Sequence, residues 1–235
     1  MRRQRGAALL LVLWVLALLA VLLGGLAGWV QLESRQALWL RQHTQTVLAA
    51  EAGIAMAMAM ADRHWIADGL DRALSFDDAQ VQVNLRSERG KLYLINAEAQ
   101  DLMRLALACG ASPAEAGQWV KALEARRNQG LAPFRVLEEV RQLPGMTQAL
   151  YSQLLPEITL WSDLDRPDPA FASPLMRQAL NLPHADAEGA DPGEVLVVDS
   201  RAQRPGGYQA RLQVTVLLSP SEDSAQPYRV LRWQE

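Results

Sequence analysis

The sequence predicts an α+β fold, in which a long amino-terminal helix packs on an antiparallel sheet and a block of helices interrupts the strands. A long run of helix-forming residues opens the chain, and strand-like alternation occurs both before and after a second helical stretch. The length of 235 residues allows one compound domain or two small ones beside that helix. The formal net charge of -3 gives no general attraction for nucleic acid.

The chain opens with a basic segment that contains three arginines, followed by an apolar run from Ala7 to Val30. A run of this length can cross about 30 Å of hydrocarbon as a helix, whereas the apolar part of a cleaved signal peptide has about 7 to 15 residues. Because arginine stays on the cytoplasmic side, we expect a single-pass anchor with its amino terminus in the cytoplasm. Residues 7–30 are therefore predicted to be the transmembrane part of the first helix.

The first helix is predicted to continue through residues 31–64. This segment contains no proline and one glycine, Gly53, and it is rich in good helix formers. A continuous helix from Ala7 to His64 would extend about 87 Å at about 1.5 Å per residue. The alternating methionines at 56, 58 and 60 spread around such a helix, so we expect them to pack against a sheet.

Residues 65–95 are predicted to form the first part of the sheet. Val81, Val83 and Leu85 alternate with polar residues, and Leu92–Ile95 follows a polar turn that contains Gly90. We therefore expect these two segments to pair as a hairpin.

Residues 96–160 are predicted to be a helical domain inserted into the sheet. Ser112, Pro113 and Glu115 provide an N-cap, a proline at the first helical position and an acid at the third, so a helix should run to about Arg127. Two further helices are expected at 134–143 and 147–155.

Residues 161–235 are predicted to complete the sheet. Apolar alternation indicates strands at 194–199, 208–218 and 228–233, separated by loops with proline, glycine or serine. A lone hairpin is too small to be stable, so the strands on both sides of the helical block should form one sheet.

Asp163, Asp165 and Asp168 form an acidic cluster that could supply oxygen ligands to calcium. The glycine and distal glutamate of an EF-hand loop are absent, and Arg166 with two prolines fits a solvated turn equally well. Calcium at these three residues is the metal site that the sequence suggests. The histidines, His43, His64 and His184, lie far apart and match no paired metal-ligand spacing, and no catalytic motif is present, so we expect no enzymatic activity.

The junction at Gly6 resembles the leader of type IV pilin-like proteins, in which a short basic segment ends in glycine before the apolar helix. The resemblance implies that residues 1–6 are a prepilin leader, that a prepilin peptidase cuts between Gly6 and Ala7, and that the new amino terminus is methylated. Most such proteins carry glutamate five residues after the cut, where this chain has Leu11. An ordinary signal anchor with a chance Arg-Gly pair is the alternative.

The lack of that glutamate resembles the K component of type II secretion pseudopili. Leu94–Ala97, Leu143–Thr147 and Tyr228–Trp233 resemble this family's entry into a helical insert, a later helical segment and the last strand. The resemblance implies a pilin-like fold and a minor pseudopilin at the tip of the pseudopilus, which initiates assembly for export of folded proteins across the outer membrane. The family's acidic Trp-Asp segment is missing at 122–130, so its calcium sites cannot be transferred there.

The implied partners are the I and J components, the rest of the pseudopilus, the prepilin peptidase and the inner-membrane secretion platform. The implied location is the bacterial inner membrane, with the domain in the periplasm. A minor pilin of a type IV pilus is one alternative. A membrane-anchored helix-hairpin-helix DNA-binding protein is another, suggested by Cys109-Gly110 and Pro144-Gly145. Residues 91–161 carry seven basic and seven acidic residues, however, and a neutral module is a poor ligand for duplex phosphates.

Overall fold

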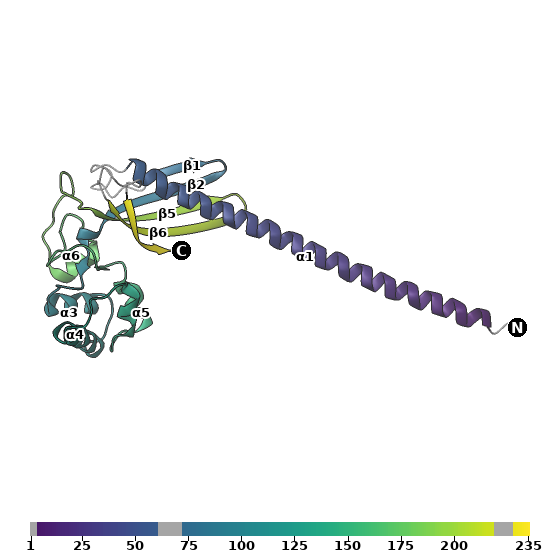
Figure 1. Cartoon of the computed structure of the whole chain (residues 1–235), viewed down its shortest axis with the longest axis horizontal. Helices are drawn as coiled ribbons and strands as arrows, with labels where there is room; N and C mark the ends of the chain where they lie inside the picture. Colours follow the sequence, from purple (N-terminus) through teal and green to yellow (C-terminus); the bar gives the residue numbers. More distant parts are fainter. Residues whose placement is uncertain (1–3, 61–71, 219–227) are drawn as a thin grey trace.

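The computed structural model describes residues 4–60, 72–218 and 228–235, without the side chains at 4–11, 23–28, 30 and 60. The described chain has the predicted α+β composition, with a long helix, an antiparallel sheet and a block of helices (Figure 1). The long helix, α1, runs without interruption from Gln4 to Met60 over 57 residues, which corresponds to about 85 Å. The predicted continuous helix is confirmed to Met60, and the predicted end at His64 lies outside the described residues.

The described strands include a five-stranded antiparallel sheet with the order β1-β2-β5-β6-β7. Its strands are β1 (Arg72–Phe76), β2 (Ala79–Ser87), β5 (Val195–Arg204), β6 (Tyr208–Leu218) and β7 (Tyr228–Gln234). The predicted strands at 208–218 and 228–233 match β6 and β7, and β5 extends past the predicted strand at 194–199. The turn between β5 and β6 contains Gly206 and Gly207, both at positive φ.

The predicted hairpin between Val81–Leu85 and Leu92–Ile95 is wrong. The partner of β2 in its hairpin is β1, which the sequence did not reveal, and the turn between them contains Asp77 at positive φ. The polar segment after β2 forms a short 3-10 helix, η1 (Glu88–Gly90), capped by Ser87. The following strand β3 (Leu92–Tyr93) therefore leaves the sheet and pairs in parallel with β4 (Ile158–Thr159).

The helical block lies in the chain between β2 and β5, two strands that pair directly with each other. It contains α3 (Ala99–Ala108), α4 (Pro113–Asn128), the 3-10 helix η2 (Leu137–Gln142), α5 (Gln148–Leu154) and α6 (Pro174–Leu180). Ser112 starts α4 with the predicted capping box, and Thr147 caps α5. The segment predicted as a helix at 134–143 is instead the shorter η2.

The buried apolar side chains that the structure describes gather into two clusters. One joins α1 to the inner face of the sheet, and the other fills the helical block around Trp119, which is fully buried. Met176 and Leu180 of α6 belong to the second cluster. The helical block thus extends beyond the predicted boundary at residue 160, because α6 completes its core.

Candidate assembly helix

The carboxyl-terminal part of α1 packs on the sheet through one face of small residues. Thr46, Ala50 and Ala57 are fully buried, and Gly53 lies between them at the same helical spacing. A Cβ atom on Gly53 would lie 2.6 Å from Val81 Cγ1 and 2.7 Å from Ser200 Oγ. The missing side chain therefore lets the helix approach β2 and β5 closely. The sequence contained this signal, since small residues recur at 46, 50, 53 and 57, but it did not show which partner they face.

A buried hydrogen bond holds the helix at the same place. The Ser200 hydroxyl on β5 donates to the Ala50 carbonyl oxygen at 2.8 Å. Ser200 is fully buried, so this bond satisfies a hydroxyl that would otherwise be costly to bury. At the edge of the contact, Arg204 Nη1 donates to Gln45 Oε1 at 2.8 Å.

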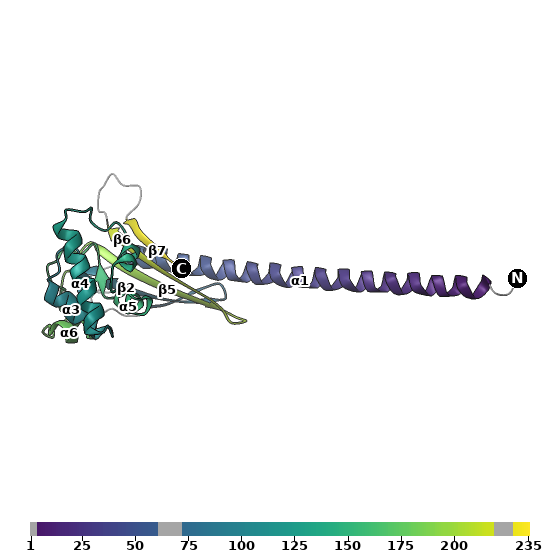
Figure 2. The same cartoon turned by 90° about the horizontal axis from the view of Figure 1, so that it is seen from below.

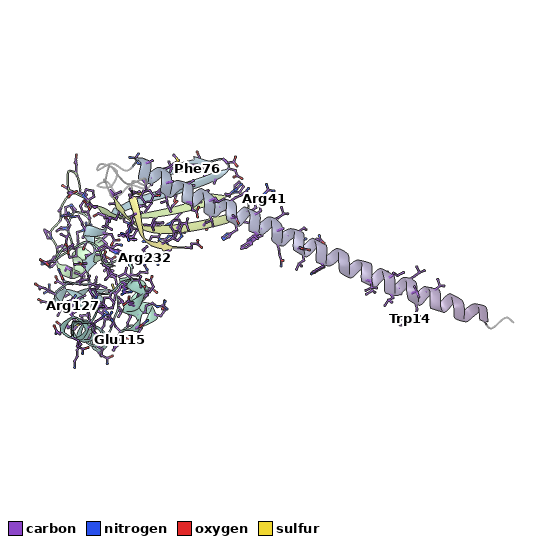
Figure 3. The ribbon with its side chains drawn as sticks, in the orientation of Figure 1. Trp14, Arg41, Phe76, Glu115, Arg127 and Arg232 are labelled. Carbon is purple, nitrogen blue, oxygen red and sulfur yellow. The ribbon has the colours of Figure 1, made fainter. Side chains whose placement is uncertain are left out.

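The amino-terminal part of α1 leaves the domain as a free rod. Figures 1 and 2 show it extending away from the sheet, and Trp14 lies far along it in Figure 3. Every described side chain from Val12 to Leu40 is exposed, including Trp14 at 74% and Trp39 at 55%. Within the part of the chain that the structure describes, no helix meets the length and apolarity needed to cross a membrane.

The rod keeps large apolar residues after the point where charge resumes at Glu33. Leu38, Trp39 and Leu40 are each more than half exposed, and the Trp39 ring stacks on His43 with 5.1 Å between ring centroids. Large apolar groups gathered on one surface segment are typical of contact with lipid or protein. This segment lies between the predicted membrane span and the sheet.

The residues predicted to be processed or to direct assembly lie at the start of α1. The backbone of Gly6, Ala7 and Leu11 is helical, but their side chains lie outside the described residues. The predicted transmembrane span of 7–30 includes other such positions. Cleavage after Gly6 and the role of Leu11 therefore remain predictions.

The acidic loop at residues 163–168 makes polar contacts with η1 and with α3. Asp168 lies 3.7 Å from Arg89, and its carboxylate accepts a hydrogen bond from the Ala170 backbone at 3.0 Å. Arg166 binds the buried carboxylate of Asp101 at 3.0 Å and thereby ties the loop to α3. Among all described residues, no three acidic, histidine or cysteine side chains are placed to hold a metal. Calcium at Asp163, Asp165 and Asp168 stays a prediction from the sequence.

Several contacts fix the helical block against the sheet. Arg232 of β7 pairs with Glu138 of η2 at 2.5 Å, and Ser87 at the end of β2 donates to the Pro192 carbonyl at 2.5 Å. Burial works to raise the pKa of Glu138, but Arg232 and then Arg141 hold that pKa below its usual value. The Arg232–Glu138 pair thus joins the helical block to β7, and the Ser87–Pro192 hydrogen bond joins the two ends of the insertion to each other.

Cys109 is part of the core of the helical block. The thiol lies 3.7 Å from the Gln153 carbonyl oxygen, and burial followed by the nearby Glu157 carboxylate raises its pKa to about 11. A thiol with this pKa is almost entirely protonated at neutral pH and is a poor nucleophile.

The Pro144-Gly145 turn, one of the two considered for DNA binding, packs against α4. A Cβ atom on Gly145 would lie 2.5 Å from the Glu115 carbonyl oxygen and 2.7 Å from the backbone nitrogen of Trp119. This turn therefore presses against α4, whereas a phosphate-binding hairpin must offer its amides to the ligand. The arrangement disfavours DNA binding through Pro144-Gly145.

No protein-family model matches the sequence, and no curated protein matches it. The fold is similar to a chain in the crystal structure of the GspK-GspI-GspJ complex from the type 2 secretion system of enterotoxigenic Escherichia coli. The TM-score is 0.49 and the sequence identity is 15%, and the match covers 87% of this chain and 97% of that chain. A likeness at this level does not establish a family.

Proposed function

We propose that this chain is a minor pseudopilin of a type II secretion system, of the K-component kind, acting at the tip of the pseudopilus. The observation that carries the proposal is the division of α1. Its last turns form the domain core with the sheet, while its first part is an exposed apolar rod. A subunit built in this way can offer its rod to neighbouring helices without unfolding its domain.

The rod requires a cover of lipid or protein. The described side chains from Val12 to Val21 include no charge, and the large apolar ones are about half exposed or more. Exposure of such an apolar surface to water is unfavourable. With the basic residues before it, the rod supports insertion in the inner membrane before assembly, with the domain in the periplasm and residues 1–6 on the cytoplasmic side for the prepilin peptidase.

The tip position is supported by the placement of the helical block. The block lies at the end of the molecule opposite the amino terminus of α1 (Figures 1 and 2). In a fibre made from parallel rods, a bulky block at that end is accommodated most easily where no subunit follows. Leu11 also supports a place at the tip, since its side chain provides no carboxylate for the amino group of a further subunit.

The proposal is tested by co-purification from detergent-solubilised membranes. The full-length chain should be recovered with tagged I and J components and with the inner-membrane secretion platform. Recovery with the minor pilins of a type IV pilus instead would contradict the secretion assignment and favour the alternative machinery.

A further inference from the structure

The sheet face that points away from α1 carries a set of polar side chains that the proposed function does not use. We call it the outer sheet face and define it by Gln82, Asn84, Arg86, Asp199, Arg201 and Arg211. The strand register places Gln82 opposite Arg201, Arg201 opposite Arg211, and Asn84 opposite Asp199. These residues alternate with the buried side chains that contact α1, so they lie on the opposite face.

Asp199 holds two arginines in fixed positions on this face. Its side chain is 4% exposed, and its two oxygens accept hydrogen bonds from Arg201 Nε at 3.1 Å and Arg211 Nε at 3.0 Å. The side chains of Arg201 and Arg211 are 58% and 57% exposed. One carboxylate thus orients two guanidinium groups, which leaves a net positive charge and further N–H donors towards solvent.

Arg86 adds a third positive charge with no compensating acid. No ion pair or hydrogen bond joins it to any residue in the described ranges. Arg86 and Arg201 border a cavity of about 260 Å³ that Asp199 also lines. Beyond Arg201 lies a larger groove of about 750 Å³ across β1, β2, β5 and β6, lined in part by Arg211. This concentration of positive charge contrasts with the chain's formal net charge of -3.

We propose that the outer sheet face binds an extended acidic segment of a partner protein. Guanidinium groups bind carboxylates through paired hydrogen bonds, and the exposed amide of Gln82 offers both donors and acceptors that match a peptide backbone. Four strands at about 4.8 Å spacing give a groove about 14 Å across, which suits about four extended residues. A lipid headgroup would use the arginines alone. This surface lies opposite α1, so the inference does not depend on the assembly role of the rod.

The test measures binding of a fluorescent peptide of alternating glutamate and threonine to the full-length chain in a non-ionic detergent. We expect saturable binding that weakens as salt increases, because the contacts are between exposed charges. Arg86→Gln combined with Arg201→Gln should raise Kd about tenfold, at about threefold for each exposed charge pair. The matched control is Arg104→Gln, an exposed arginine on α3, which should leave Kd unchanged.

Three outcomes would overturn the inference. A matched glutamine and threonine peptide could bind as well as the acidic one, or the double variant could bind the acidic peptide with unchanged Kd while its circular dichroism matches the parent. Arginine-dependent binding to anionic lipid vesicles without binding of the peptide would assign the face to a membrane surface. If the double variant unfolds, Arg86→Gln alone gives the same comparison, since Arg86 contacts no described acid.

Discussion

Gly53 sets the distance between α1 and the sheet. A glycine inside a helix costs about 1 kcal/mol relative to alanine, so its presence at a fully packed position has a structural reason. That reason is the contact with Val81 and Ser200, where a Cβ atom would come within 2.7 Å of each. The sequence revealed an isolated glycine in a long helix, but the contact depends on strands far away in the chain.

Replacing Gly53 with alanine should therefore destabilise the protein. The gain in helix propensity is about 1 kcal/mol, but overpacking of a tight core contact costs typically 1–3 kcal/mol and forces β2 and β5 to shift. We expect a net decrease of about 1 kcal/mol in the free energy of unfolding. Denaturant unfolding of the full-length chain, followed by tryptophan fluorescence, measures this change.

Gly117→Ala on α4 is the matched control. Its nearest neighbour, Met103 Cε, would be 3.9 Å from the new Cβ atom, which is ordinary contact. This change should be neutral or stabilising by up to about 1 kcal/mol. Equal effects at Gly53 and Gly117 would show that α1 does not approach the sheet as closely as described.

Among the elements, α4 has the most defined beginning. The Ser112 hydroxyl accepts from the Glu115 backbone at 3.3 Å, and Glu115 Oε2 accepts from the Ser112 backbone at 2.9 Å. Hydrogen bonding by the Ser112 side chain, and then by its backbone, lowers the pKa of Glu115 below its ordinary value of 4.5. The two residues thus close the end of the helix together.

Ser112→Ala should destabilise the helical block by about 1 kcal/mol. Because the folded-state pKa of Glu115 is lowered, its contribution is present above the ordinary pKa and is lost as pH falls through the folded-state value. The difference in melting temperature between parent and variant should therefore shrink as pH falls below 4.5. Thermal unfolding followed by near-ultraviolet circular dichroism, to which the buried Trp119 contributes, measures it.

Ser152→Ala is the control for this prediction. Ser152 lies on an exposed part of α5 and bonds back to the Gln148 carbonyl at 2.9 Å, so alanine should cost little. A Ser112→Ala effect that equals the Ser152→Ala effect at neutral pH would contradict the capping role.

Local signals predicted the elements that are defined by nearby residues. The Ser112 cap gave the start of α4, and clear alternation gave β6 and β7. β1 was missed because its five residues have little alternation and two exposed positions at its start. α6 was missed although Ser173 and Pro174 carry the same start signal as α4. The pairing of β3 with β4 depends on the fold of the block between them, which no local pattern encodes.

At the scale of the whole molecule, α1 has an exposed apolar rod at its amino-terminal end and a segment packed on the sheet at its carboxyl-terminal end. The sequence predicted the continuous helix, but both halves are rich in apolar and small residues, so composition did not show where the sheet begins to cover it. The structure places the first buried side chain of α1 at Thr46 among the described residues. The outer sheet face was not predicted either, because Asp199, Arg201 and Arg211 come together only through strand pairing.

Replacing Trp39 and Leu40 of the rod with glutamine should weaken the proposed association with the I and J components. Full burial of one large apolar side chain contributes roughly 1.5–3 kcal/mol, so co-purification should fall about tenfold or more. The free energy of unfolding of the sheet and helical block should not change, because both side chains are more than half exposed. Leu107→Gln, on an exposed position of α3, is the control and should leave recovery unchanged.

Mass spectrometry of the mature amino terminus tests the pseudopilin assignment most directly. The full-length chain should be expressed with and without the prepilin peptidase and then isolated from membranes. We expect the chain to begin at Ala7 when the peptidase is present and to keep residues 1–6 when it is absent. A chain that keeps Met1 to Gly6 with an active peptidase, while a known pseudopilin in the same cells is processed, would contradict the assignment.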